Sequence, residues 1–165
     1  MMNKTFTFEA LPQSAEALRK LPEASLDDPY KTAALTILAL AAYEKNPEAS
    51  LEMLNFLKGP EPLSVYEKQF LKDRLRGKEY KLRSFFSGAK PENNYTPNVP
   101  YEIVLKESPT SFQNEHCAIL YVFCGGADSP RPLKFREKPS TGQWFLNAIE
   151  CLSDIRLPVA EDKWA

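Results

Sequence analysis

Gly88-Ala-Lys-Pro-Glu-Asn-Asn-Tyr-Thr-Pro-Asn-Val-Pro100 is the stretch that decides the fold, because the pattern of apolar residues differs on its two sides. It holds three prolines and three asparagines. Proline fixes φ and lacks the amide hydrogen, so this stretch is a connection rather than a helix. Before it, apolar residues recur with helical spacing, and after it they alternate with a period of two. Helices first and strands second predict an α+β protein in which helices back an antiparallel sheet.

After this connection, the alternation predicts a β-meander of about four strands in residues 101–152. Tyr101–Lys106 is typical of a half-buried strand, and the continuously apolar run Cys117–Cys124 is typical of a central strand covered on both faces. Leu133 and Phe135 alternate with basic residues, which predicts a strand with one basic face made by Lys134, Arg136 and Lys138. A turn at residues 139–142 then leads into residues 144–149 and completes a hairpin.

Before the connection, capping signals mark where helices begin. Asp28-Pro29 and Asn46-Pro47 each place a capping side chain before a proline at the first helical position. Gly59-Pro60 ends the second of these helices. The first carries apolar residues on every face as far as Tyr43, so we expect it to be central and covered all round.

Shorter elements complete this half of the chain. Ser64 and Glu67 form a capping box, and the helix that they begin is expected to turn three side chains inward: Tyr66, Phe70 and Leu71. Ser14 caps a short helix, and residues 79–87 form another short segment with Phe85 and Phe86 available for packing. Thr5–Glu9 alternates as a short strand or an extended arm does.

Composition bounds the class of protein. Lys and Arg total 21 against 22 Asp and Glu, a net charge of −1, which argues against a dedicated binder of nucleic acid or of a membrane surface. We expect a single domain over residues 1–165: residues 1–88 mainly helical, residues 89–100 connecting, residues 101–152 mainly strands, and residues 153–165 a tail docked on the domain. Three cysteines make no disulfide framework, and the first residues show no signal peptide, so we expect a cytoplasmic protein.

Catalytic and metal signals are weak. His116 and Cys117 suggest a base beside a nucleophile, but neighbours in a strand point to opposite faces, so a buried structural cysteine is the preferred interpretation. One His and three separated Cys offer no metal-ligand spacing. Gly125-Gly126 follows a strand, but Asp128 and two prolines come next, which favours a turn over a phosphate loop. The sequence predicts no cofactor and no catalytic residue.

Basic side chains gather in two places. Seven surround the end of the helix that begins after Ser64, where cations complement the helix dipole: Lys68, Lys72, Arg74, Arg76, Lys78, Lys81 and Arg83. A solvated face is favoured there over phosphate binding. The basic face formed by Lys134, Arg136 and Lys138 either protects an edge strand from aggregation or meets an acidic partner. Arg156 either pairs with Asp154 and anchors the tail or binds a ligand carboxylate.

Six stretches of the sequence belong together: residues 57–64 (LKGPEPLS), 84–89 (SFFSGA), 93–97 (NNYTP), 125–131 (GGADSPR), 143–146 (QWFL) and 153–165 (SDIR to EDKWA). Together they resemble an uncharacterised family of bacterial proteins that is carried as a domain of unknown function and is met mainly in gut-type Firmicutes. The resemblance runs from about Tyr30 to the end, and Lys163 stands where the family has proline. It implies a bacterial, cytoplasmic protein with this fold as a unit, and it implies no activity.

These stretches lie mostly in expected loops, where binding residues concentrate. The candidate binding residues are Asn94, Tyr95, Asp128, Arg131, Arg156 and Trp164. The alternative is that the loops pack together and that their Asn and Asp side chains form turns. We therefore expect a non-catalytic binding or regulatory module whose partner is an unidentified protein or small ligand. The alternative is a small, hydrolase-like enzyme with a cleft between helices and sheet.

The tail carries a separate expectation. A free tail gains nothing from exposing an indole, so Trp164 is expected to pack back on the domain. Ile155 would be a second apolar anchor, and Asp154 or Arg156 would fix the polar side. If the indole is exposed instead, the tail is a free arm whose Trp awaits a partner.

Overall fold

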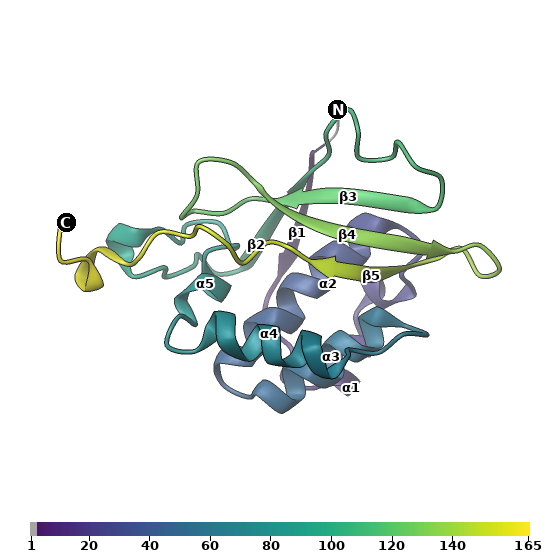
Figure 1. The fold of residues 1–165 in the computed structure, drawn as a ribbon, viewed down its shortest axis with the longest axis horizontal. Coiled ribbons are helices and arrows are strands. Elements are labelled where there is room, and N and C mark those ends of the chain that lie inside the picture. Colours follow the sequence, from purple (N-terminus) through teal and green to yellow (C-terminus); the bar gives the residue numbers. More distant parts are fainter. Residues whose placement is uncertain (1–2) are drawn as a thin grey trace.

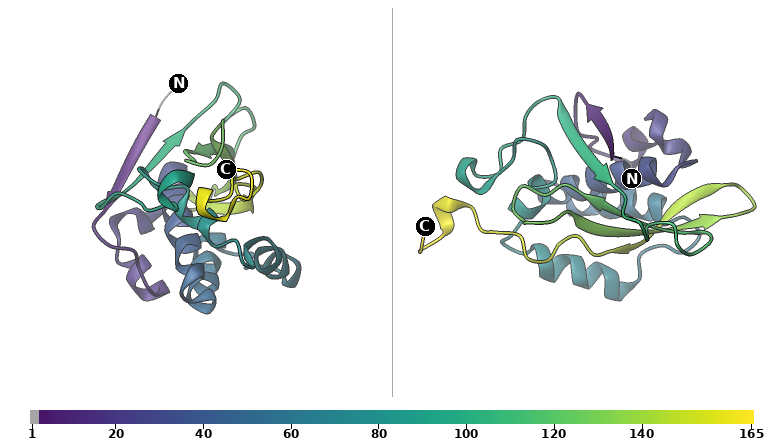
Figure 2. Two further views of the ribbon diagram at one scale, coloured as in Figure 1. Left: turned by 90° about the vertical axis from the view of Figure 1, so that its left-hand side faces the viewer. Right: turned by 90° about the horizontal axis from the view of Figure 1, so that it is seen from above.

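A five-stranded antiparallel sheet with helices on one face forms the fold, which we describe for residues 3–165 from a computed structural model (Figure 1). The strands lie in chain order: β1 (Asn3–Phe8), β2 (Tyr101–Lys106), β3 (Cys117–Val122), β4 (Arg131–Lys138) and β5 (Gln143–Ile149). The helices are α1 (Ala15–Arg19), α2 (Pro29–Ala41), α3 (Pro47–Lys58), α4 (Val65–Leu75) and α5 (Tyr80–Arg83). The predicted α+β arrangement, with helices in the N-terminal half and the sheet mainly in the C-terminal half, is confirmed. Seen from above, the opposite face of the sheet is free of helices in this part of the chain (Figure 2).

The sheet has five strands rather than about four because the N-terminal segment joins it. β1 pairs with β2 in antiparallel register, from Asn3 opposite Lys106 to Phe8 opposite Tyr101. Phe8 is buried, and Phe6 packs against the core. This pairing joins residues about 100 positions apart in sequence, and a local pattern of apolar residues cannot indicate which distant strand a segment pairs with. The short alternation at residues 5–9 is therefore the only sequence signal for an edge strand.

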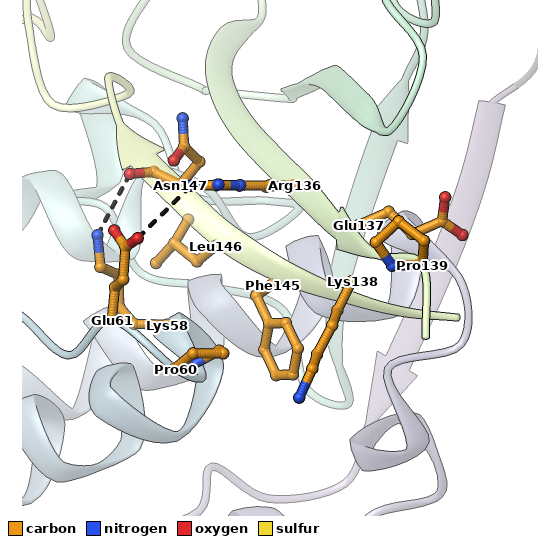
Figure 3. A pocket seen from close by; sticks show the side chains of 10 residues that line it. All are labelled: Lys58, Pro60, Glu61, Arg136, Glu137, Lys138, Pro139, Phe145, Leu146 and Asn147. Carbon is orange, nitrogen blue, oxygen red and sulfur yellow. Dashed lines mark hydrogen bonds and ion pairs between the residues drawn. The ribbon is translucent and has the colours of Figure 1, made fainter. Parts of the chain in front are cut away.

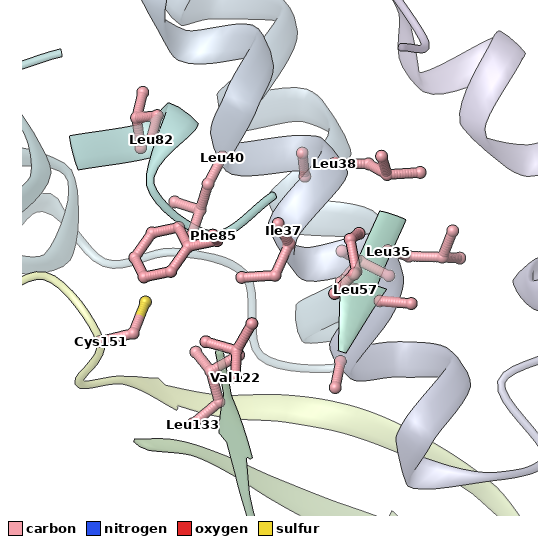
Figure 4. Packing of buried hydrophobic residues seen from close by; sticks show 14 of the residues in the cluster. Leu35, Ile37, Leu38, Leu40, Leu57, Leu82, Phe85, Val122, Leu133 and Cys151 are labelled. Carbon is pink, nitrogen blue, oxygen red and sulfur yellow. The ribbon is translucent and has the colours of Figure 1, made fainter. Parts of the chain in front are cut away.

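α2 is the central helix, as the sequence predicts. The Asp28 carboxylate accepts a hydrogen bond from the Tyr30 amide at 2.8 Å and so caps the first turn. The side chains from Ala33 to Leu40 are all buried. Figure 4 shows Ile37 and Leu40 directed toward Phe85 and the sheet residue Val122. The helix therefore has neighbours on all sides, which explains why no face of it is polar.

α3 and α4 begin at the predicted caps, but α4 presents a different face from the one expected. Ser64 and Glu67 form both hydrogen bonds of a capping box. Leu71 and Leu75, four residues apart, are the buried positions of this helix. Tyr66 lies five residues before Leu71, about 140° around the helix, and its side chain is 79% exposed. The expectation that Tyr66 faces the core is wrong, whereas Leu71 is buried and Phe70 half-buried as expected.

β3 is central but covered on only one face. Ala118, Leu120 and Val122 are buried, whereas Cys117 is exposed and Tyr121 is half-buried on the other face. The expectation of a strand covered on both faces, with a buried Cys117, is wrong. The reason is that the helices pack on a single side of the sheet.

β4 is an interior strand, paired with β3 and β5. Its basic residues therefore protect no edge. Lys134 pairs with Glu150 (Nζ–Oε1, 3.2 Å), and Arg136 contacts Glu61 (Nη1–Oε1, 3.6 Å). The hairpin that joins β4 to β5 is as predicted.

The tail is docked only in its first part. Ile155 is buried as predicted, but Trp164 is 94% exposed, so the expectation that its indole packs on the domain is wrong. Arg156 pairs with Asp128 rather than with Asp154, at 2.9 Å between Nη1 and Oδ1. The ring packed beside this first part of the tail is the fully buried Tyr95 rather than Trp164.

Candidate functional site

Four of the six candidate residues from the sequence meet at one end of the molecule, where the loops after α5 and β3 lie beside the tail (Figures 1 and 2). Tyr95 stacks on Tyr80 with ring centroids 5.6 Å apart, and its hydroxyl donates to the Arg156 carbonyl at 2.5 Å. The Arg156 guanidinium in turn pairs with Asp128. Asn94 adopts φ 54°, and its carbonyl accepts a bond from Arg83.

These contacts are mainly those of packing. Burial raises the pKa of Tyr95 to about 12, so its hydroxyl stays protonated and keeps donating. A side chain at Gly126 would run into the Tyr95 hydroxyl and into Ile155, which explains the glycine. The Asn93 side chain accepts from the Lys90 and Thr96 amides, as expected for a turn.

The remaining two candidates lie apart from this packing. Arg131 begins β4 and is half-buried, and its Nε atom has no hydrogen-bond partner among residues 3–165. Trp164 projects into solvent. Of the predicted basic cluster around α4, Lys81 and Arg83 turn inward: Lys81 donates to the Leu152 carbonyl at 2.8 Å, and Arg83 pairs with Glu44.

His116 has the carboxylate neighbour that an enzyme would need. Its Nδ1 lies 2.8 Å from Glu137 Oε1, and this hydrogen bond raises the pKa of the imidazole. Cys117 is exposed beside it. Neither His116 nor Cys117 lines the hollow at Phe145, the hollow at Tyr66 or the hollow at Tyr101. Nor does this part of the chain gather three His, Cys, Asp or Glu side chains that could hold a metal ion.

One hollow lies between the α3–α4 loop and the β4–β5 hairpin, and we call it the hairpin pocket (Figure 3). It has a volume of ≈ 220 Å³. Residues 58, 60 and 61 form one side, and residues 136–139 and 145–147 form the other. Figure 3 shows the Phe145 ring and the Lys138 side chain lying next to each other at the pocket.

Local structure at the end of α3 builds the pocket wall. Gly59 ends the helix with φ +67°, and any side chain there would collide with the Phe145 ring. The Lys58 ammonium donates to Glu67 Oε2 at 2.9 Å and to the Asn147 carbonyl at 3.3 Å. The Lys58 side chain is only 9% exposed, so these bonds fasten the loop to β5.

The charges in the pocket leave two cations for a ligand. Lys58 is neutralised by Glu67, whereas Arg136 makes only a long contact with Glu61, at 3.6 Å between Nη1 and Oε1. Both of those side chains are mostly exposed, so this pair is weak. Lys138 has no ionic partner within the described range 3–165. Two carboxylates also line the pocket, Glu61 and Glu137, and Glu137 is bonded to His116. The pocket thus presents Arg136 and Lys138 beside the apolar surface of Phe145 and Leu146.

A second hollow of ≈ 240 Å³, which we call the helix pocket, lies between α4 and the end of β5. Its walls are Leu63, Tyr66, Glu67, Phe70 and Leu71 on one side and residues 148–150 on the other. A third hollow, of ≈ 170 Å³, lies near Arg83 and Tyr101. The sequence pattern predicts the basic face of β4 but neither of the pockets along β5, because their second walls come from residues more than 70 positions away.

Comparisons with known proteins identify the family but assign no role to these pockets. A family model described as a domain of unknown function (DUF6935) matches residues 10–159. Neither the search of curated proteins nor the search of solved structures found a match. None of the helices over residues 3–165 is long and apolar enough to cross a membrane. The family match starts earlier than the resemblance seen in the sequence and ends before residues 160–165. Because it covers most of the chain, the protein belongs to the DUF6935 family, an uncharacterised domain family.

Proposed function

We propose that this protein is a non-catalytic binding module and that its ligand binds in the hairpin pocket. The observation that carries the proposal is the pair of cations, Arg136 and Lys138, placed beside the Phe145 ring with no strong partner of their own. Such an arrangement suits a ligand with an acidic group and an apolar part. A carboxylate can accept two parallel bonds from a guanidinium while the apolar part covers the ring.

The size of the pocket favours a peptide segment over a large cofactor. Sites for drug-sized ligands usually measure about 300–1,000 Å³, and this pocket measures ≈ 220 Å³. It has room for one or two side chains. A protein partner that presents an acidic residue next to an apolar residue therefore fits the pocket better than a nucleotide or a flavin. The proposed partner is thus an acidic peptide segment.

The loop surface predicted from the sequence is not the ligand site in this proposal; it positions the tail. Tyr95, Asp128 and Arg156 hold the loops and the tail together, and Trp164 remains exposed for a contact with a partner. In this proposal Tyr95, Asp128 and Arg156 support binding by positioning the tail that carries Trp164. Asn94 and Arg131 gain no ligand role from the contacts described.

A small enzyme is the alternative, and the His116–Glu137 hydrogen bond is the observation that favours it. A carboxylate that orients an imidazole is common in nucleophilic catalysis. Against it, the His116 Nδ1 atom bonds to Glu137, and no hydrogen bond joins the imidazole to Cys117 among residues 3–165. An enzyme would also need a cavity next to His116 and Cys117 that keeps water away from the substrate.

The experiment is a binding titration with short capped peptides that carry a Glu two or three residues from an aromatic residue. The matched peptides replace Glu with Gln. We expect the Glu peptides to bind, and we expect Lys138→Glu to weaken this binding at least tenfold. Lys72→Glu makes the same charge change at an exposed position on α4 and should leave the affinity unchanged. Equal binding of Glu and Gln peptides, or equal affinity in the Lys138→Glu variant, would overturn the proposal.

A further inference from the structure

The two pockets follow one another along β5, and the Lys58 ammonium, bonded to the Asn147 carbonyl and to Glu67, lies between them. The hairpin pocket contacts residues 145–147 of the strand, and the helix pocket contacts residues 148–150. At about 3.3 Å per residue, these six consecutive residues span about 20 Å. The residues opposite β5 all come from one stretch of the chain, from Lys58 to Leu71. In Figure 1, α4 lies below β5 in the view. We call the two pockets together the β5 groove.

The groove has a different chemistry at each end. At the hairpin end, Arg136 and Lys138 are cations without strong partners. At the other end, Tyr66 is 79% exposed, and the half-buried Phe70 ring lies beside it on α4. An extended segment with a carboxylate at one end and a large apolar side chain at the other end would complement this surface.

Strand addition is not the way such a segment would bind. The Trp144 amide donates to the Leu26 carbonyl at 2.7 Å, and the Trp144 carbonyl accepts from the Thr32 hydroxyl at 2.7 Å. Further along, the Asn147 carbonyl accepts from Lys58. The outer backbone edge of β5 is thus partly occupied. A ligand in the groove would be recognised by its side chains rather than by a new strand.

The protein itself carries a segment of this chemistry. Residues 159–165, which we call the arm, read Val-Ala-Glu-Asp-Lys-Trp-Ala, and every one of them is exposed. Glu161 and Asp162 have no ionic partner in the described part of the chain, and the Trp164 indole is 94% exposed. In the structure the arm is turned: Val159–Glu161 is one 3-10 turn, and the Asp162 carboxylate accepts from the Trp164 amide at 2.8 Å. If the arm straightens on binding, two or three residues separate the carboxylates from the indole by about 7–10 Å. This is a length that the β5 groove accommodates.

We propose that the arm of one copy of this protein binds in the β5 groove of a second copy. The carboxylate of Glu161 or Asp162 meets Arg136 and Lys138, and the Trp164 indole packs on Tyr66 and Phe70. The inference rests on the proposed function, because it uses the same hairpin pocket and names its ligand.

Docking takes place between copies because of where the arm starts. Ile155 and Pro158 are buried and hold the tail at the end of the molecule opposite the β4–β5 hairpin (Figure 1). From there the arm leads away from its own hairpin pocket. Arm and groove are different surfaces, so the contact is heterologous and repeats from copy to copy into a chain or a closed ring. Association should therefore rise with protein concentration and fall with salt.

Complementary variants provide the test. Trp164→Ala removes the arm's indole and keeps the groove, whereas Lys138→Glu damages the groove and keeps the arm. By sedimentation velocity, the wild type should show a mean mass that rises with concentration, and each variant alone should stay monomeric. An equimolar mixture of the two variants should form one heterodimer, because one intact arm meets one intact groove. Val99→Ala, which changes an exposed apolar residue elsewhere, should associate as the wild type does.

A labelled peptide of residues 158–165 separates this inference from the proposed function. It should bind the Trp164→Ala variant, and at least tenfold more weakly when Lys138→Glu is added. If this peptide fails to bind and the wild type stays monomeric, while other acidic and aromatic peptides bind through Lys138, the arm is not the ligand and the proposed function stands. If no acidic peptide binds, both proposals fail. Failure of the two monomeric variants to pair with each other would also overturn the inference.

Discussion

Tyr95 joins three loops through one side chain. Its ring is fully buried against Tyr80, its hydroxyl donates to the Arg156 carbonyl, and Gly126 leaves the space that the hydroxyl occupies. Gly126→Ala should destabilise the protein by about 1–3 kcal/mol through overpacking. Tyr95→Phe should cost about 1–2 kcal/mol, because a carbonyl loses its donor.

The double variant tests whether the two positions share one space. Without the hydroxyl, a methyl group at residue 126 meets fewer atoms, so the double variant should lose less stability than the sum of the single losses. Urea unfolding of the four proteins measures the coupling. Simple additivity would show that Gly126 is required for another reason.

His116 gives the protein a local pH dependence. The hydrogen bond with Glu137 raises the imidazole pKa above its usual 6.5. The pair thus stabilises the fold below pH 6.5, and its contribution disappears as pH rises through the raised value. His116 has φ 61°, which asparagine tolerates, so His116→Asn is the suitable variant. We expect it to lower the urea midpoint at pH 5.5 and to leave it unchanged at pH 9. If the variant lowers the urea midpoint equally at pH 5.5 and pH 9, the effect comes from the backbone conformation at residue 116 and not from the charge of the imidazole.

The three thiols should differ in reactivity according to burial. Cys117 is exposed, whereas Cys124 and Cys151 are buried, and burial raises the pKa of Cys151 to about 12. A thiol reagent at pH 8 should modify one cysteine rapidly in the folded protein and all three after denaturation. Cys117→Ser should remove the rapid phase. Rapid modification of two thiols would mean that the loops around Cys124 open readily.

At the start of α2, one carboxylate links the helix to the edge strand. One oxygen of Asp28 caps the helix at the Tyr30 amide, and the other accepts from Lys4 of β1 at 2.8 Å. Asp28→Ala should cost about 1–2 kcal/mol, whereas Asp28→Asn keeps a good cap and should cost less than about 1 kcal/mol, since the pair with Lys4 is partly exposed. Urea midpoints measure both, with Asp27→Ala as the neighbouring control. If Asn costs as much as Ala, the ion pair matters more than the cap.

Caps of this kind make the starts of the helices predictable from the sequence, whereas the exposure of Cys117 and the pairing of β1 are not predictable in this way. The signals at Asp28, Asn46 and Ser64 act within a few residues, so the sequence reveals them locally. The exposure of Cys117 depends instead on which face of the sheet the helices cover. The addition of β1 depends on a pairing across the whole helical half.

The candidate site likewise has one part that the sequence predicts and another that depends on contacts between distant residues. The alternation of residues along β4 is enough to predict that Arg136 and Lys138 share one face of the strand. The pocket also needs Gly59, whose lack of a side chain admits the Phe145 ring, and Lys58, whose ammonium fastens the loop to β5. These contacts join positions that are more than 80 residues apart. A pattern of period two or 3.6 carries no information about them.

For the whole molecule, the structure divides the tail into an anchored part and a free part, and two truncations separate them. Residues 159–165 are exposed, so deleting them should leave the urea midpoint unchanged at concentrations where the protein is monomeric. Deleting residues 152–165 removes the buried Leu152 and Ile155, and it takes the carbonyl partner away from the buried Lys81 ammonium.

Burial already lowers the pKa of Lys81, so loss of its acceptor leaves a charge that is neither hydrated nor bonded. The longer truncation also loses the burial of two apolar side chains, and this loss is partly offset because fewer residues must be ordered. Together these effects should lower the free energy of unfolding by on the order of 3–5 kcal/mol. A short truncation that lowers the midpoint as much as the long one would show that the indole does pack on its own domain. Unchanged stability with lost self-association is the result expected if the arm serves a second copy.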